Sequence, residues 1–148
     1  MSRPAVRTRR HARELAFRVI FQADVAQVTL AEAWQLRQEE ERPGRDAAEL
    51  VSDVVLALEK RGAEVNEILQ GAAENWTLER LAATDRAVLR AAIAELLARP
   101  GTPARVVLDE AIEVAKRFGA ADSGRFVNGV LDRAARRLRP GEFSGTGS

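Results

Sequence analysis

The segment from Arg105 to Arg139 constrains the fold most, because its apolar pattern restricts it to two amphipathic helices. In its first half, apolar residues recur at intervals of three and four, the spacing of one helix face. Pro103 suits the start of that helix, because its missing N–H would have no partner there. Gly119 suits its end, because glycine takes the left-handed conformation that often ends a helix. The apolar positions are Val107, Leu108, Ala111, Ile112, Ala115 and Phe118.

The second helix of this hairpin is predicted to begin at Asp122 and Ser123. A short polar side chain there accepts hydrogen bonds from the first free N–H groups of a helix. Gly129 lies inside the helical pattern, where glycine costs about 1 kcal/mol relative to alanine. A close approach by another helix would explain that glycine. The apolar stripe comprises Phe126, Val127, Val130, Leu131, Ala134 and Leu138.

Polar and aromatic residues gather at the first turn of this second helix. Asp122, Ser123 and Arg125 stand next to Phe126 in the sequence, so a surface with polar and aromatic side chains is expected there. The alternative is a capped helix whose phenylalanine belongs to the core.

The rest of the chain shows the same helical spacing, with no alternating strand pattern and no sequence repeat. Thr29 and Asp46 each begin a capping-box pattern. Gly62 is expected to end or kink a helix, and Trp76 to seal a junction between helices. The fold class is therefore all-α, with about seven helices. Besides the hairpin, we predict helices that begin near Arg9, Thr29, Asp46, Gly62 and Thr84.

The 148 residues are enough for one domain with a substantial core. We expect that single helical domain to span residues 9–139. Residues 1–8 are expected to form a flexible basic tail, since Pro4 interrupts any helix there. Residues 140–148 are rich in glycine and serine and are expected to be disordered.

Basic residues are concentrated at both ends of this domain, although the formal net charge is only +1. Arginine presents a planar fork to phosphate and stacks on bases. A basic patch of this kind indicates nucleic-acid binding, and the alternative is a solvated basic tail. The first group is Arg3, Arg7, Arg9, Arg10 and Arg13; the second is Arg133, Arg136, Arg137 and Arg139.

Several kinds of chemistry find no support in the sequence. The absence of cysteine excludes disulfides and thiolate chemistry and argues against a zinc site. The segment 119–124 is followed by Arg125 and Phe126 where a phosphate-binding loop has lysine and then serine or threonine, and it follows a helix rather than a strand. Asp109, Glu110 and Glu113 could form a carboxylate cluster for acid–base chemistry, but Asp109 and Glu113 lie one helical turn apart and a solvated face is the expected interpretation. We therefore expect no enzyme activity and no cofactor.

No apolar run reaches 18 residues, and no apolar stretch follows the basic N-terminus. Neither a membrane span nor a secretory signal is predicted. A cytoplasmic location is the resulting expectation.

Three segments resemble, in the family's order, the NusB family of bacterial transcription antitermination factors. DEAIEVAKRFGAADSGRFVNGVLDRAA, residues 109–135, is similar to the family's C-terminal signature. RRHARELAFRVIFQAD, residues 9–24, and TLERLAATDRAVLRAAIAELL, residues 77–97, resemble its first and middle helices. The resemblance implies two small helical bundles packed together, with the first helix beside the C-terminal one.

The same resemblance implies a function. It suggests a non-catalytic RNA-binding factor that binds the boxA element of nascent ribosomal-RNA leaders. It also implies a heterodimer with NusE, a small-subunit ribosomal protein, and a place in the RNA polymerase antitermination complex. A homodimer is left open, because some members of the family self-associate.

Eight residues at matching positions are expected to contact RNA. Phosphates would be held by Arg9, Arg10, His11 and Arg13, with His11 standing where the family often has another arginine. Phe21 and Phe126 would stack on or touch bases, and Asp122 and Ser123 would bond to base edges. The alternatives are that His11 only faces water and that the two phenylalanines belong to the core.

Two other functions remain open from the sequence. One is a helical protein–protein adaptor without an RNA site of its own, and the other is a chaperone of ribosomal-RNA precursors. Titration with boxA-like and scrambled RNA separates the three functions. The adaptor would bind neither RNA, and the chaperone would bind both equally.

Overall fold

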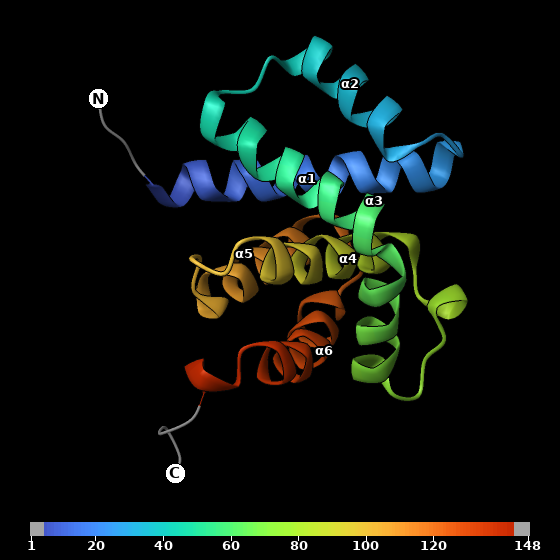
Figure 1. The fold of residues 1–148 in the computed structure, drawn as a ribbon. Helices are drawn as coiled ribbons and strands as arrows, with labels where there is room; N and C mark the ends of the chain where they lie inside the picture. Colours follow the sequence, from blue (N-terminus) through green and yellow to red (C-terminus); the bar gives the residue numbers. More distant parts are fainter. Residues whose placement is uncertain (1–4, 144–148) are drawn as a thin grey trace.

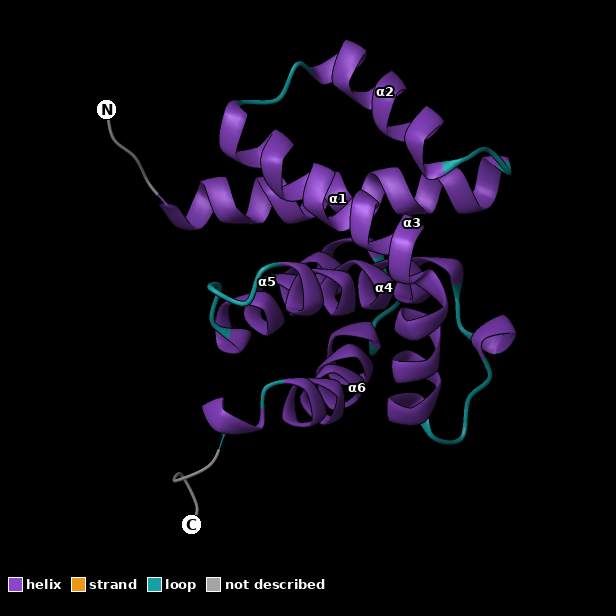
Figure 2. Cartoon of the chain, viewed as in Figure 1, coloured by secondary structure: helices purple, strands orange, loops and turns teal. Residues whose placement is uncertain are grey.

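The computed structural model describes residues 5–143, and this part of the chain is helical without any strand (Figure 2). The four terminal residues before it and the five after it lie outside the described part. The helices are α1 (Ala5–Ala26), α2 (Leu30–Glu41), α3 (Arg45–Ala73), α4 (Ala83–Ala98), α5 (Ala104–Phe118) and α6 (Ser123–Leu138), with 3-10 turns η1 (Leu78–Arg80) and η2 (Pro140–Glu142).

The all-α prediction is confirmed, but the expected number of about seven helices is slightly too high. The helices predicted before and after Gly62 are one 29-residue helix, α3, with a kink at Arg61. Arg61 has φ −127° and ψ 26°, outside the helical range. Buried apolar residues lie on both sides of the kink, so the helix continues after the single distorted residue.

Helix α1 lies in the middle of the molecule. Figure 1 shows α2 and the first half of α3 on one side of α1, and α4 and α5 on the other. A small core cluster joins α1, α2 and α3 around Leu15, Val19, Trp34 and Val51. A larger cluster joins α1 and α3 to α4, α5 and α6. Both α1 and α3 therefore contribute to two cores.

The two capping boxes predicted from the sequence differ in outcome. Thr29 caps α2 as predicted: Glu32 N donates to Thr29 Oγ1 at 3.0 Å, and Thr29 N donates to Glu32 Oε1 at 2.9 Å. The prediction for Asp46 was wrong. Helix α3 already begins at Arg45, with Gly44 as its N-cap and no capping side chain. Asp46 lies in the first turn, where its charge favours the positive end of the helix dipole.

The ordered part extends past the predicted limits of residues 9 and 139. Helix α1 begins at Ala5, and Pro140–Glu142 form η2 inside the segment that we expected to be disordered. Glu142 explains this order, because its Oε1 accepts from Ala104 N at 2.8 Å and so caps α5. The hydrogen bond from the Ala104 backbone is the main reason that the pKa of Glu142 lies below its ordinary value, and a hydrogen bond from the Arg139 side chain lowers this pKa further.

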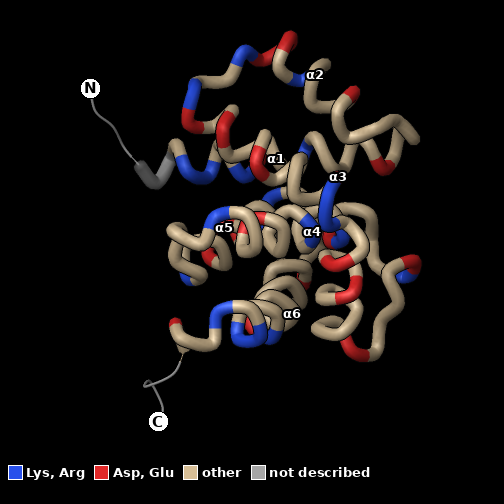
Figure 3. Tube along the Cα trace, viewed as in Figure 1, with Lys and Arg blue, Asp and Glu red and all other residues tan. Residues whose placement is uncertain are grey.

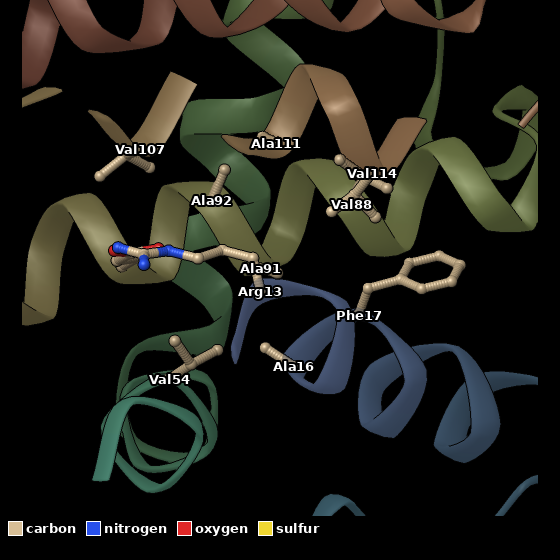
Figure 4. A pocket seen from close by; sticks show the side chains of 11 residues that line it. Arg13, Ala16, Phe17, Val54, Val88, Ala91, Ala92, Val107, Ala111 and Val114 are labelled. Carbon is tan, nitrogen blue, oxygen red and sulfur yellow. The ribbon is translucent and has the colours of Figure 1, made fainter. Parts of the chain in front are cut away.

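Arg13 and Glu95 form an ion pair between α1 and α4. Arg13 Nε donates to Glu95 Oε1 at 3.1 Å, and Arg13 Nη2 bonds to the other carboxylate oxygen. Their side chains are only 13% and 2% exposed. Figure 4 shows Arg13 extending along α4 in a space lined by α3, α4 and α5. The free volume there is about 10 Å³, room for at most one water molecule.

Breaking this pair from one side should be costly. Arg13→Ala leaves the buried Glu95 carboxylate without its cation, and we expect the free energy of unfolding to fall by about 3–5 kcal/mol. The double variant Arg13→Met/Glu95→Leu should recover most of that loss, since no charge is then left buried. Urea unfolding of the three proteins measures this. A single variant as stable as the parent protein would contradict it.

Candidate nucleic-acid interface

The first described turns of α1 bring two of the predicted arginines to one carboxylate of α5. Arg10 Nε donates to Glu110 Oε1 at 3.2 Å, and Arg9 Nε lies 3.8 Å from Glu110 Oε2. Glu110 is only 5% exposed, whereas each arginine side chain is 40% exposed. The carboxylate therefore positions both guanidinium groups but leaves the cluster with a net positive charge that solvent or a ligand can reach.

The next two predicted phosphate ligands differ from each other. His11 is exposed, so its side chain is available at the surface. Arg13 is not, because both of its hydrogen bonds to Glu95 are made inside the molecule. Arg13 therefore holds α1 on α4, and we remove it from the expected phosphate contacts. Sequence spacing could not reveal this, since the two partners are 82 positions apart.

Helix α5 runs alongside α1 in the same direction, as a series of contacts shows. Glu110 meets Arg10, Arg117 Nη1 donates to both oxygens of Glu14 at 2.7 Å, and Phe118 stacks on Phe17 with centroids 5.0 Å apart. The end of α5 therefore lies beside the middle of α1.

Aromatic and basic side chains continue along this α1–α5 seam. Phe21 is half-buried and stacks on Phe17 at 5.6 Å. The guanidinium carbons of Arg18 and Arg117 lie 5.1 and 5.0 Å from the Phe118 ring centroid, within the range of cation–π attraction. The sequence predicted Phe21 here. It did not single out Arg18, Arg117 or Phe118, although the basic end of α5 was a signal.

The turn between α5 and α6 is built around Ser123, which is only 1% exposed. Ser123 Oγ accepts from Ala120 N at 2.9 Å, and Ser123 N donates to Ala120 O at 3.0 Å. Its hydroxyl therefore holds the turn closed and is not free for a base edge. We correct the prediction for Ser123 on this ground.

Gly119 is required in this turn for a reason other than the one predicted. Its φ is −97°, so it does not take the left-handed conformation. A Cβ atom at Gly119 would instead lie 2.5 Å from Ser123 Oγ and 2.8 Å from Ala115 O. The glycine is needed because the turn leaves no space for a side chain.

Asp122 and Phe126 remain accessible beyond this turn. Asp122 occupies the N-cap position of α6 but makes no capping hydrogen bond, and it is exposed. Phe126 is half-buried against the larger core, and its ring meets Trp76 edge-on with centroids 6.2 Å apart. Trp76 is 48% exposed, so the prediction that it seals a helix junction was wrong.

The predicted residues that remain accessible thus lie on α1 and in the segment that follows α5. Arg9, Arg10, His11 and Phe21 lie on α1, and Asp122 and Phe126 follow the end of α5, which packs on α1. Figure 3 shows the basic positions of the first half of α1 and of α6. Cations and aromatic rings of this kind hold phosphates and bases. In the described part of the chain, no group of three His, Cys, Asp or Glu residues is placed to hold a metal ion.

The sequence and the fold both have known relatives. The profile of the NusB family matches residues 10–136, which include every residue assigned above except Arg9. This chain belongs to the NusB family. The transcription antitermination protein NusB of Koribacter versatilis is 40% identical over 135 residues, covering 88% of this chain and 90% of that protein. The protein of the same name from Sorangium cellulosum is 42% identical over 131 residues, covering 85% of this chain and 90% of its own.

Solved structures share the fold over nearly the whole chain. T. maritima NusB superposes with a TM-score of 0.80 at 33% identity, covering 97% of this chain and 99% of that chain. A chain of the crystal structure of the antitermination factors NusB and NusE in complex with dsRNA gives a TM-score of 0.79 at 26% identity, covering 88% of this chain and 98% of its own. None of the helices between residues 5 and 143 is long and apolar enough to span a membrane.

Substitutions at two neighbouring positions of the α5–α6 turn should show which side chain stabilises the fold and which only lies at the surface. Ser123→Ala removes the acceptor of the Ala120 N–H, and we expect it to lower the free energy of unfolding by about 1–3 kcal/mol. Asp122→Ala removes no hydrogen bond of the fold, and its unfolding curve should match that of the parent protein. Chemical denaturation of both variants is the measurement. Equal losses in the two would refute this division.

Proposed function

We propose that this chain is a non-catalytic RNA-binding factor of transcription antitermination. It binds the boxA element of nascent ribosomal-RNA leaders together with NusE and acts within the RNA polymerase complex in the cytoplasm. The family match over residues 10–136 carries this proposal, supported by relatives that are named transcription antitermination proteins. The solved NusB–NusE complex with dsRNA supports both the nucleic acid and the protein partner.

Within this function, the accessible residues divide by chemistry. Arg9, Arg10 and His11 are assigned to phosphates, because they lie together in the basic first turns of α1. Phe21 and Phe126 are assigned to bases, since each ring is only partly covered. Asp122 is assigned to a base edge. Single-stranded RNA is recognised through this combination of phosphate contacts, stacking and edge hydrogen bonds.

A mobility-shift titration tests the function directly. We expect boxA RNA to bind more tightly than a scrambled sequence of equal length, and NusE to raise the affinity, because two surfaces that share one RNA gain from effective concentration. If neither RNA binds, with or without NusE, the chain is a protein adaptor. Equal binding of both RNAs would instead indicate a chaperone.

Arg10→Ala should lower the affinity for all RNA sequences by a similar factor, because a phosphate contact carries no sequence information. The dependence of log affinity on log salt concentration should become shallower by about 0.7, the change for one lost single-strand phosphate contact. Lys60→Ala is the matched control. Lys60 is exposed on α3 and belongs to neither assigned group. The assignment fails if both variants change the salt slope equally.

A further inference from the structure

Trp76 is the one aromatic side chain among the large hydrophobic residues that the described chain leaves exposed. It is 48% exposed, whereas Trp34 is 8% exposed and donates through its indole Nε1 to Ser52 Oγ. The indole N–H of Trp76 has no acceptor within residues 5–143. An indole ring in water forgoes a large gain from burial, so a contact that covers its face would be favourable.

The surrounding chain holds this ring in place. Trp76 follows the C-terminal end of α3, where Glu74 has a φ of 56° and turns the chain away from the helix. Gln70 Nε2 donates to the carbonyl oxygen of Trp76. The edge-on contact with Phe126, at an interplanar angle of 74°, fixes the ring from the side of α6. A pre-positioned ring loses little freedom when a ligand stacks on it.

The α6 surface beyond Phe126 is partly exposed at Gly129 and carries the exposed cation Arg133. Arg133 lies two turns beyond Phe126, is 45% exposed, and donates from Nε to Ala72 O at 2.7 Å, with Glu74 at 3.9 Å. Gly129 lies between them on α6. A Cβ atom there would meet only the Arg133 guanidinium, at 4.0 Å. The close helix approach expected at Gly129 is therefore absent, and no contact within residues 5–143 requires the glycine.

We propose that Trp76 is a second base-binding residue, whose indole face takes an unpaired RNA base next to the base held at Phe126. Arg133 is then placed to meet the phosphate between or beyond these bases. The inference rests on the proposed function and extends it along α6. Aromatic rings next to arginines are the usual platform for single-stranded nucleic acid. Because the two rings are nearly perpendicular, bases that use both must unstack from each other.

Tryptophan fluorescence tests the contact. The chain has two tryptophans, so Trp34→Phe leaves Trp76 as the sole indole emitter. Titration of this protein with single-stranded boxA RNA should quench its emission, with a midpoint equal to that of the mobility shift. The converse variant, Trp76→Phe, retains only the buried Trp34, and its emission should stay unchanged. A melting curve for each variant shows that the fold is intact.

Affinity measurements complete the test. Trp76→Ala should weaken the binding of boxA RNA about 5- to 150-fold with only a small fall in melting temperature, because the side chain is half exposed and loses one ring contact. Trp76→Phe should retain most of the affinity, since a ring remains. Leu138→Ala is the control. Leu138 is a half-buried residue of α6 that contacts neither Trp76 nor Phe126 through an aromatic pair. Its loss should therefore lower the stability of the fold but leave the affinity for RNA unchanged.

The outcomes separate this inference from the proposed function. If wild-type protein shifts boxA RNA but Trp76 is not quenched and Trp76→Ala binds equally well, the inference is wrong and the function stands. If Trp76→Ala loses affinity for NusE in the absence of RNA while RNA affinity is unchanged, Trp76 belongs to a protein interface and the inference is wrong again. If wild-type protein binds no RNA, the proposed function fails and the inference fails with it.

Discussion

Three buried carboxylates in ion pairs between α1 and its neighbours determine where that helix lies. Glu95 on α4 accepts from Arg13, Glu110 on α5 accepts from Arg10, and Glu14 on α1 accepts from Arg117 of α5. A buried carboxylate without its cation is strongly destabilising, so α1 cannot slide or rotate by one turn without breaking several pairs together. These pairs therefore set the register of α1 along α5. The same register places Arg9 and Arg10 beside the middle of α5, and Phe21 near the end of α5 through the shared contact with Phe17.

Features that depend on neighbours in the chain were predictable from the sequence. The apolar stripes of α5 and α6 gave their extents to within a residue or two, because a helix must bury one face whatever packs against it. The capping box at Thr29 is equally local. Partners across space were not predictable, since residue spacing carries no information on them. In the sequence, Arg13 is one more member of a basic run. Its partner Glu95 is 82 positions away, and their ion pair lies inside the molecule.

Residues can also be correctly singled out for the wrong physical reason. Gly119 was expected for its backbone freedom, but the structure requires it for lack of space beside Ser123. Ser123 was expected at the surface, yet its hydroxyl closes the turn from within. Trp76 was expected to seal a junction between helices, but it lies half exposed after α3. In each case the residue type limited the roles that the residue could have, and its neighbours in the folded structure determined which role it has.

Helix α3 passes through both cores, whereas α2 packs mainly on α1 and the first half of α3. The buried residues of α2, Ala33 and Trp34, belong to the small cluster, and only the half-buried Leu30 also packs against the larger one. The cores on the two sides of α1 thus differ in size, and we expect the smaller one to open at a lower free-energy cost. We therefore expect the amide hydrogens of α2 to exchange through a local opening that costs less than global unfolding, and those in the second half of α3 to exchange only when the larger cluster comes apart. Such an opening on the side of α2 would leave α4, α5 and α6, which lie across α1 from it, in place (Figure 1).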